Sequence, residues 1–237
     1  MINLNDHLLA TDGSGGKQNY YHNIKSVSTN VYFRDLKNKL IGHINEYEII
    51  VGCIAWLTDF DILRALASKQ ASIIVQKEDF LRPDLQSRSN WKKHLRMAYS
   101  SLHFKYCRYD FQNNILSSMS VSSDPNMKAV RCVGNYNSDK KPAFPRMHNK
   151  FIVFCKYESN AIWDGVETEF DNIIPCAVWT GSFNFTKNAT HSFENALFIE
   201  EPDIAMAYFK EYGFIAGLSE PLDWSSEWCE PEWRIGT

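Results

Sequence analysis

Hydrophobic positions along the chain alternate between strand-like runs and helix-like stripes. Two runs, Glu48–Trp56 and Ala71–Gln76, are continuously apolar and rich in β-branched residues, as in strands covered on both sides. Between them, apolar residues recur at helical spacing over Ile62–Ala67, after Thr58 or Asp59, either of which can cap a helix. This order predicts two parallel strands joined by a right-handed helical crossover.

The same criteria predict the remaining elements. A helix is expected over Val31–Ile44, where Phe33, Leu36, Leu40 and Ile44 fall on one face. Four more strands are predicted at Met127–Val133, Met147–Cys155, Pro175–Thr180 and Asn195–Ile199. Helices are predicted from residue 90 towards 106, from Asn184 to Ala189 and from Pro202 to Phe214. The fold class is therefore α/β, with a mixed, largely buried β-sheet flanked by helices on both faces.

Length and composition favour one domain. The chain has 237 residues, of which 44% are hydrophobic, enough for one substantial core. We divide it into an N-terminal extension (1–30), a core (31–218) and an acidic, Trp-rich tail (219–237). The tail is expected to dock onto its own domain, with a protein partner as the alternative. No internal repeat is visible in the sequence.

Several classes of protein are disfavoured. No run of about 18 or more apolar residues occurs, so no membrane span is expected. Residues 1–6 lack a basic region followed by an apolar stretch, so we do not expect a secreted protein. The six cysteines form neither a CxxC pair nor a regular framework, which is typical of reduced cysteine and makes no zinc signature. We expect a cytoplasmic protein with no metal and no other cofactor.

Charge is distributed unevenly although the net charge is only −3. Between Arg82 and Arg108 there are seven basic residues, one acid and several aromatic residues. Such a stretch suits a nucleic-acid backbone and its bases, and Lys92, Lys93 and Arg96 are its candidate substrate-binding residues. A solvated helix face would explain the pattern equally well. From Glu194 to the end, ten acids face only two basic residues.

The most informative residues are His148, Lys150, Ser182 and Asn184. In a strand, His148 and Lys150 would project from the same face, two residues apart. Ser182 and Asn184 lie where a predicted strand gives way to a predicted helix, and the N-terminus of a helix favours an anion. Together these side chains would make a phosphate site with an imidazole nucleophile and no metal.

These residues resemble the motifs of the phospholipase D superfamily, the HKD family. Its pattern is HxK, four residues and Asp, followed later by GSxN. His148-Asn149-Lys150 matches the first part, Gly181-Ser182-Phe183-Asn184 the second, and Glu194-Asn195 a Glu-Asn pair of the small single-motif endonucleases. The resemblance extends from about residue 45 to residue 215 and implies the phospholipase D-like fold.

The sequence departs from the family pattern at two points. Cys155 stands where the family has its Asp, which the resemblance treats as a structural support, so we expect activity to survive. The segment 156–174 is longer than the family's usual gap and is polar. We interpret it as a surface insertion that shapes access to the site.

The resemblance also implies a role for each residue. His148 would be the nucleophile or, in a second copy, the general acid. Lys150 and Asn184 would hold phosphate oxygens, Ser182 would donate a hydroxyl, and Glu194 would accept a hydrogen bond from His148. Arg146 could reach the phosphate. Three alternatives stay open: Ser182 and Asn184 as helix caps, Glu194 as a surface acid, and a competing role for His191.

A single HxK motif has a consequence for assembly. The family's chemistry uses two histidines on opposite sides of phosphorus, so the resemblance implies a homodimer with one shared site. We predict a metal-independent endonuclease that cleaves DNA, or RNA as the second choice, through a phosphohistidine. The rival hypotheses are a phospholipid phosphodiesterase and a catalytically weak nucleic-acid-binding subunit of a larger complex, reached through the acidic tail.

Overall fold

The computed structural model describes residues 27–81, 90–104, 128–134, 146–159, 162–163, 166–167 and 171–222. Most of the predicted N-terminal extension, residues 105–127 and the Trp-containing part of the tail lie outside these ranges. So do four basic residues of the stretch described above, Arg82, Arg88, Lys105 and Arg108.

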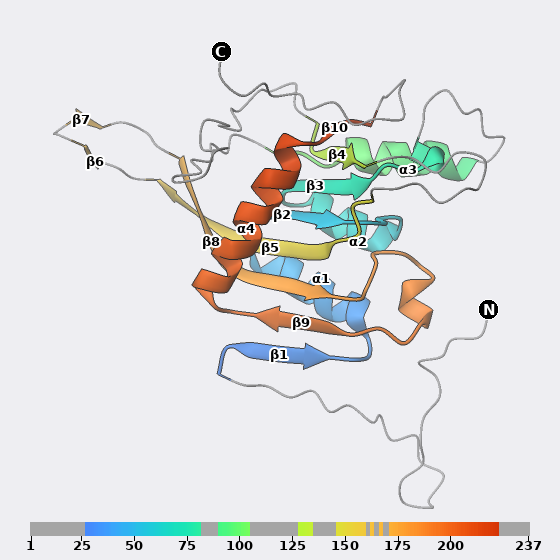
Figure 1. Ribbon diagram of the computed structural model, residues 1–237, viewed down its shortest axis with the longest axis horizontal. Coiled ribbons are helices and arrows are strands. Elements are labelled where there is room, and N and C mark those ends of the chain that lie inside the picture. Colours follow the sequence, from blue (N-terminus) through green and yellow to red (C-terminus); the bar gives the residue numbers. More distant parts are fainter. Residues whose placement is uncertain are drawn as a thin grey trace, which may run out of the picture.

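The helices and strands alternate along most of the chain (Figure 1). The strands are β1 (Thr29–Tyr32), β2 (Ile49–Ile54), β3 (Gln70–Gln76), β4 (Val130–Val133), β5 (Lys150–Ser159), β6 (Ile162–Trp163), β7 (Val166–Glu167), β8 (Asp171–Gly181), β9 (Ala196–Ile199) and β10 (Glu220–Pro221). The helices are α1 (Leu36–Glu46), α2 (Phe60–Ala67), α3 (Asn90–Ser100) and α4 (Pro202–Gly217), with short 3₁₀ helices at Asp79–Leu81 (η2) and Ala189–His191 (η3).

One eight-stranded mixed sheet organises the molecule. Its strand order is β1-β9-β8-β5-β2-β3-β4-β10, and β6 and β7 form a separate two-stranded sheet. Strands β2, β3 and β4 run parallel to one another, whereas the other neighbours are antiparallel. Helices cover both faces of this sheet, so the predicted fold class is confirmed.

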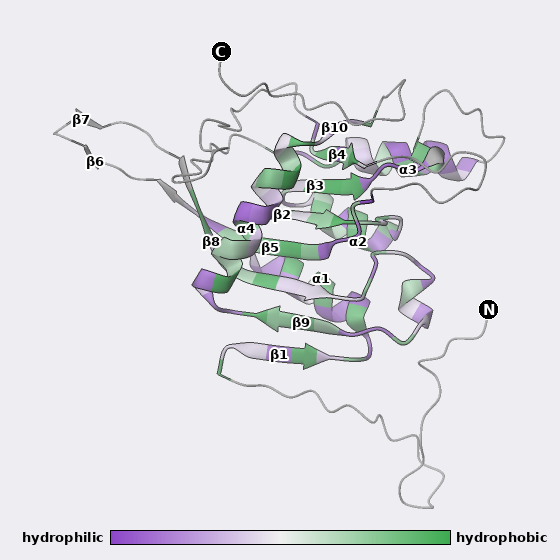
Figure 2. Ribbon diagram, viewed as in Figure 1, coloured by the Kyte–Doolittle hydropathy of each residue, from purple (hydrophilic) through white to green (hydrophobic). Residues whose placement is uncertain are grey.

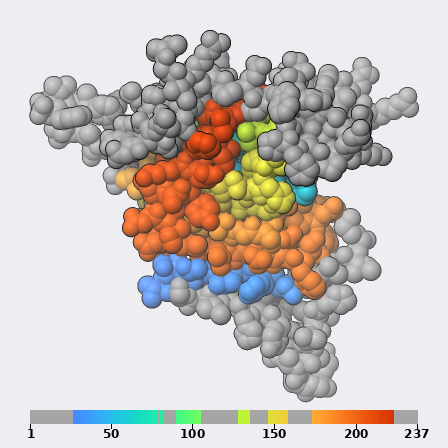
Figure 3. Space-filling view, viewed as in Figure 1, coloured from blue at the N-terminus to red at the C-terminus, as the bar shows by residue number. Residues whose placement is uncertain are grey.

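Two hydrophobic clusters lie on opposite faces of the sheet. The larger one joins α1, α2 and α3 to one face, and the smaller one lies under α4 on the other. Figure 2 shows hydrophobic residues running along β3 and β5 in the middle of the sheet, and Figure 3 shows α4 (red) at the surface of its face. Along β5, Ile152 belongs to the first cluster and Val153 to the second, as expected for a strand covered on both sides.

The predicted strand–helix–strand unit is present as β2, α2 and β3. The two strands pair in parallel from Ile49 with Gln70 to Ile54 with Val75. Asp59 caps α2, because its carboxylate accepts hydrogen bonds from the backbone N–H groups of Asp61 (2.9 Å) and Ile62 (3.2 Å). Of the two candidate caps, the structure therefore selects Asp59.

The predicted helix over Val31–Ile44 was wrong in its first part. Residues 29–32 form β1, an edge strand paired with β9, and the helix begins only at Leu36. Phe33 does not share the buried helical face, because it precedes the helix and is 40% exposed. The apolar spacing alone could not separate a short edge strand from the first turn of a helix.

The predicted helix over Asn184–Ala189 was also wrong. Phe183 and Phe185 are both buried, which is the two-residue alternation of an extended chain. Phe185 is bonded to the loop after β2, since its N–H donates to the carbonyl of Trp56 and its own carbonyl accepts from the N–H of Thr58. This pairing keeps the segment extended, and only the short η3 follows it.

The described parts of the insertion at 156–174 do not lie near the candidate site. Lys156–Ser159 pairs with Asp171–Ile174, so β5 and β8 continue as a two-stranded ribbon, with β6 and β7 beyond it (Figure 1). Lys150 stands at the opposite end of β5. The expectation that this segment shapes access to the site was wrong, because a strand pair carries it away from that end of the sheet.

The boundary expected between core and tail, at residue 219, cuts through an element of the sheet. Glu220–Pro221 forms β10 and pairs with β4. There Lys77 and Glu220, both buried, form an ion pair, and the Arg131 guanidinium donates to Ser219 Oγ (2.7 Å). The start of the tail is therefore part of the folded core.

No helix in the described ranges is both long enough and apolar enough to cross a membrane.

Candidate active site

The candidate residues lie in a row at one end of the sheet. The neighbouring strands β9, β8, β5 and β2 are antiparallel. The start of one strand therefore lies beside the end of the next at this end of the sheet. Glu194 precedes β9, Ser182 follows β8, His148 precedes β5, and Trp56 follows β2. The strand order thus assembles residues that are far apart in the sequence.

His148 and Lys150 lie side by side, although not as successive positions of one strand. The strand begins at Lys150, and His148 lies in the irregular segment before it. Lys150 Nζ is 3.2 Å from His148 Nδ1 and 3.3 Å from Nε2, and it donates to the His148 carbonyl at 2.8 Å. The predicted proximity is present, but the lysine reaches back to the histidine instead of standing parallel to it.

The electrostatic surroundings favour a neutral His148 imidazole. Partial burial lowers the pKa of His148, and the nearby cations Lys150 and Arg146 lower it further. Partial burial also lowers the pKa of Lys150, and the Glu194 carboxylate opposes that shift. A neutral ring keeps a free lone pair on one nitrogen, which is the form that can attack phosphorus.

Ser182 and Glu194 form a pair across the end of β8 and β9. The Ser182 hydroxyl donates to the Glu194 carboxylate and accepts from the N–H of Asn195 at 3.1 Å. The expected hydrogen bond from His148 to Glu194 is absent among the described residues. The register explains the difference, because Gly181 pairs with Ala196 and so places Ser182 opposite Glu194 and Asn195.

Gly181 makes this close approach possible. A Cβ atom at this position would collide with the carbonyl oxygen of Asn195 and with the Cα of Ala196. The glycine of the GSxN motif thus has a steric role next to the Ser182–Glu194 pair.

Asn184 presents a buried polar group to the site. Its Oδ1 is buried and has no hydrogen-bond partner among the described residues. Buried polar atoms are normally paired, so an unpaired one beside a groove is suited to a ligand. A half-turn of the carboxamide about χ2 would present its Nδ2 donor there instead. The buried neighbours Phe183 and Phe185 anchor the backbone on either side of it.

Two residues that sequence reasoning missed position His148. The N–H of Met147 donates to Gln76 Oε1 at 2.7 Å, and the Trp56 ring meets the His148 ring edge-to-face with centroids 6.1 Å apart. Gln76 is buried at the end of β3. Gln76 is a polar residue at the end of a predicted buried strand, and this position could have indicated its role. The sequence contains no comparable signal for Trp56.

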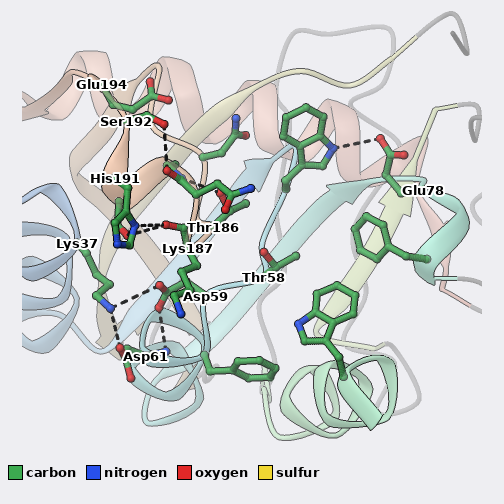
Figure 4. A pocket seen from close by; sticks show the side chains of 18 of the residues that line it. Lys37, Thr58, Asp59, Asp61, Glu78, Thr186, Lys187, His191, Ser192 and Glu194 are labelled. Carbon is green, nitrogen blue, oxygen red and sulfur yellow. Dashed lines mark hydrogen bonds and ion pairs between the residues drawn. The ribbon is translucent and has the colours of Figure 1, made fainter. Parts of the chain in front are cut away.

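A groove of about 1090 Å³ adjoins the row of candidate residues. Arg146, Asn184 and Glu194 line it, together with residues of the loop after β2 and of the segment around η3 (Figure 4). His191 also lines the groove, where its Nδ1 lies 2.8 Å from the Lys187 carbonyl. Lys37 Nζ lies 3.5 Å from Asp59 Oδ2 and 2.6 Å from Asp61 Oδ2. Figure 4 shows the lysine between these two carboxylates.

The basic residues of α3 occupy different environments. Lys92 and Lys93 do not line the groove, although the adjacent Trp91 does. The guanidinium of Arg96 donates to the carbonyl of Leu81, which ties α3 to η2. Arg96 is thus engaged within the protein, and a role of Lys92 and Lys93 in substrate binding stays a prediction.

Cys155 belongs to the core instead of the site. It is fully buried in the cluster under α4, at an irregularity in the pairing of β5 with β8. Burial raises the pKa of the Cys53 thiol, which belongs to the same cluster, well above its ordinary value, as expected in such apolar surroundings. A thiol fits this position without the cost of a buried carboxylate.

No group of three or more His, Cys, Asp and Glu side chains within the described ranges is arranged to hold a metal ion. The metal-free mechanism itself remains a prediction.

Among known proteins, the chain has distant structural neighbours and a sequence relative. No protein-family model matches the sequence. NucT from Helicobacter pylori has a TM-score of 0.48 and 15% identity over 81% of this chain and 98% of its own. Nuc, a phospholipase D family member from Salmonella typhimurium, has a TM-score of 0.46 and 18% identity over 84% and 99%. Likeness at this level says nothing about a shared activity.

The relative is an uncharacterized protein of Acanthamoeba polyphaga mimivirus, L381. It is 35% identical over 221 residues, which cover 88% of this chain and 72% of L381. The described core, for its part, combines the predicted mixed sheet with the motif residues His148, Lys150, Ser182 and Asn184 at one end of it. The mixed α/β class of the fold is the predicted one, and the assignment to the phospholipase D superfamily stays a prediction from the HxK and GSxN motifs. The chain belongs to the same family as L381.

Proposed function

We propose that this protein is a metal-independent phosphodiesterase, an endonuclease that cleaves DNA through a phosphohistidine. One observation carries the proposal: Lys150 Nζ lies 3.2–3.3 Å from both ring nitrogens of an exposed His148 whose pKa is lowered. An exposed imidazole with a cation beside it is arranged to meet an anionic phosphodiester. Asn184 and Ser182 add polar groups on the neighbouring loop and strand end.

The reaction has two balanced steps. A nitrogen of His148 forms a bond to phosphorus while the bond from phosphorus to the leaving oxygen breaks, and the partner subunit's His148 gives that oxygen a proton. In the second step, water attacks phosphorus and loses a proton to the imidazole of the partner subunit's His148. The bond between phosphorus and the first histidine breaks, which releases that histidine. Lys150 would neutralise charge on the non-bridging oxygens in both steps. His148 is exposed at the end of the sheet where β5 begins, and this exposure supports the approach of a second copy of the chain to the imidazole.

The composition of the groove favours a nucleic acid over a phospholipid. Among the described residues that line it, Ala189 is the sole aliphatic one, and the others are aromatic, charged, hydroxyl-bearing or amide-bearing. Acyl chains are held by contiguous apolar surface, whereas nucleotides combine a flat aromatic face with polar edges. DNA is our first choice of substrate and RNA the second.

The proposal is tested with the full-length protein and end-labelled DNA in excess EDTA. We expect strand cleavage that continues under chelation and falls by about 10³-fold or more in His148→Ala. An acid-quenched, protease-digested reaction should contain a peptide that carries a nucleotide on His148, detectable by mass spectrometry.

The matched control is His103→Ala, an exposed histidine near the other end of β3, which should leave cleavage unchanged. Cleavage that stops in EDTA would reject the metal-free scheme, and cleavage that survives His148→Ala would reject the assignment of the nucleophile. Labelled RNA and phosphatidylcholine vesicles, assayed in parallel, decide between the substrate classes.

A further inference from the structure

The groove contains an aromatic surface that the hydrolytic mechanism does not use. Trp91 at the start of α3 and Phe80 in η2 pack with ring centroids 5.7 Å apart and planes tilted by 60°. Both line the groove, and 40% of Trp91 remains exposed. A half-exposed indole costs free energy in water, so its position in a groove beside the candidate site points to a ligand with a flat apolar face.

This aromatic surface is connected to the nucleophile. The Trp56 ring meets the His148 ring, and Trp56 Nε1 donates to Glu78 Oε1 at 3.1 Å, shown by the dashed line in Figure 4. Glu78 is followed by η2, which carries Phe80. Trp56, Glu78, Phe80 and Trp91 all line the groove, and of these Trp56 contacts the His148 ring.

The charges in the groove argue against a track for several phosphates. Among the residues that the structure describes, Asp59, Asp61, Glu78 and Glu194 line it together with three cations, Lys37, Lys187 and Arg146. Two of these carboxylates, Asp59 and Asp61, already share Lys37. A phosphate backbone would be repelled there, whereas the polar edge of a base presents N–H donors that carboxylates and hydroxyls accept.

We propose that Trp91 and Phe80 form a base-binding subsite, which stacks an unpaired nucleobase next to the scissile phosphate and makes single-stranded nucleic acid the preferred substrate. In a duplex both faces of each base are covered by its neighbours, so stacking on Trp91 requires a base that can leave the stack. The position of the scissile phosphate beside this subsite rests on the proposed function. The binding of a base to Trp91 and Phe80 does not.

The test measures binding and therefore does not need cleavage. Fluorescence anisotropy of a labelled oligothymidylate is recorded with wild-type protein and with Trp91→Ala, against a duplex of the same length. We expect the Kd for the single strand to rise about tenfold in Trp91→Ala, with the duplex changed far less. Trp91→Phe should restore most of the affinity, because phenylalanine keeps an aromatic face.

The matched control is Phe214→Ala on α4, whose side chain has a similar exposure of 43% and lies on the other face of the sheet. A strand of the same length with abasic sites should bind the wild type with about the same Kd as the normal strand binds Trp91→Ala. The Kd of the abasic strand should not rise further in Trp91→Ala. Equal losses for single strand and duplex, or no loss at all, would overturn the subsite.

The two proposals can fail separately. His148-dependent cleavage with unchanged oligothymidylate binding in Trp91→Ala would reject the base subsite and leave the phosphodiesterase. Trp91-dependent binding without any cleavage would reject the phosphodiesterase and leave the subsite.

Discussion

At the scale of single residues, the charge state of His148 is set by its neighbours. Burial lowers its pKa, and Lys150 and Arg146 add to the shift because a second positive charge near them is unfavourable. At a given pH, a larger fraction of the His148 ring is therefore neutral than in an isolated histidine. This favours nucleophilic attack, whereas the general acid of the reaction must bind a proton when the anionic substrate arrives.

Replacing Arg146 should change this balance in a known direction. In Arg146→Gln one nearby cation is lost, so the pKa of His148 should rise from its lowered value towards the ordinary 6.5. At pH 6 a smaller fraction of the nucleophile would be neutral, and kcat/KM should fall more at pH 6 than at pH 8. An NMR titration, assigned with His148→Ala, measures the pKa directly. Arg64→Gln, an exposed arginine on α2, should leave it unchanged, and a fall in the pKa of His148 in Arg146→Gln would contradict the argument.

A second residue-scale prediction concerns Gly181. Gly181→Ala should destabilise the protein by about 1–3 kcal/mol, because the new methyl group overlaps the backbone at Asn195 and Ala196. It should also separate Ser182 from Glu194 and reduce kcat. Urea unfolding measures the first effect. Gly42→Ala is the control: a Cβ there meets nothing within 4 Å, and in helix α1 it should stabilise by up to about 1 kcal/mol. A similar stability change in both variants would be inconsistent with the steric role.

At the scale of elements, the site is built from strand ends and the loops that join them. The loop before β5 is held on both sides, since the Ala55 N–H donates to the Asn149 carbonyl at 2.9 Å and Gln76 accepts from Met147. The loop after β2 is fixed by Phe185 and by the cap of α2. The loops that carry the candidate side chains are therefore positioned by the sheet itself.

The helix cap gives an element-scale prediction. Asp59→Ala removes two hydrogen bonds at the start of α2 and should cost about 1–2 kcal/mol, a decrease in Tm of roughly 2–8 °C. Asp61→Ala removes an exposed partner of the same Lys37 and should cost less than about 1 kcal/mol. Thermal unfolding by circular dichroism compares the two. Equal losses would mean that the shared ion pair, and not the cap, is what stabilises the helix.

At the scale of the whole molecule, the proposed reaction needs two copies of one histidine. The described chain contains one His148–Lys150 pair. It lies at the end of the sheet where β5 begins, and its imidazole is exposed there. A two-fold axis through that edge would bring two identical sites together. This arrangement predicts that activity depends on the composition of the dimer, and not on the total amount of intact subunit.

Mixed dimers test this prediction. Wild type and His148→Ala, unfolded together in equal amounts and refolded, should retain about one quarter of the wild-type activity, the share of dimers with both histidines. Independent sites would retain about one half. Sedimentation first establishes that both proteins are dimers, because monomers would contradict the shared site. Activity near one half of the wild-type value would also contradict the shared site.

The sequence by itself predicted the type of fold and singled out the candidate site residues. Continuous apolar runs predicted β2 and β3, Asp59 was one of two expected caps, and the HxK and GSxN motifs singled out His148, Lys150, Ser182 and Asn184. These features are local, because periodicity, capping and motif spacing depend on neighbours along the chain. The same local criteria misjudged Val31–Ile44 and Asn184–Ala189, where pairing with a distant strand or loop decides the conformation.

Tertiary structure alone decided which side chains meet. The strand order places Glu194 against Ser182 instead of His148, sends the 156–174 ribbon away from the site, and brings Trp56, Phe80 and Trp91 to one groove. None of these outcomes follows from spacing in the sequence, because the order and register of strands depend on long-range hydrogen bonds and on packing over both faces of the sheet.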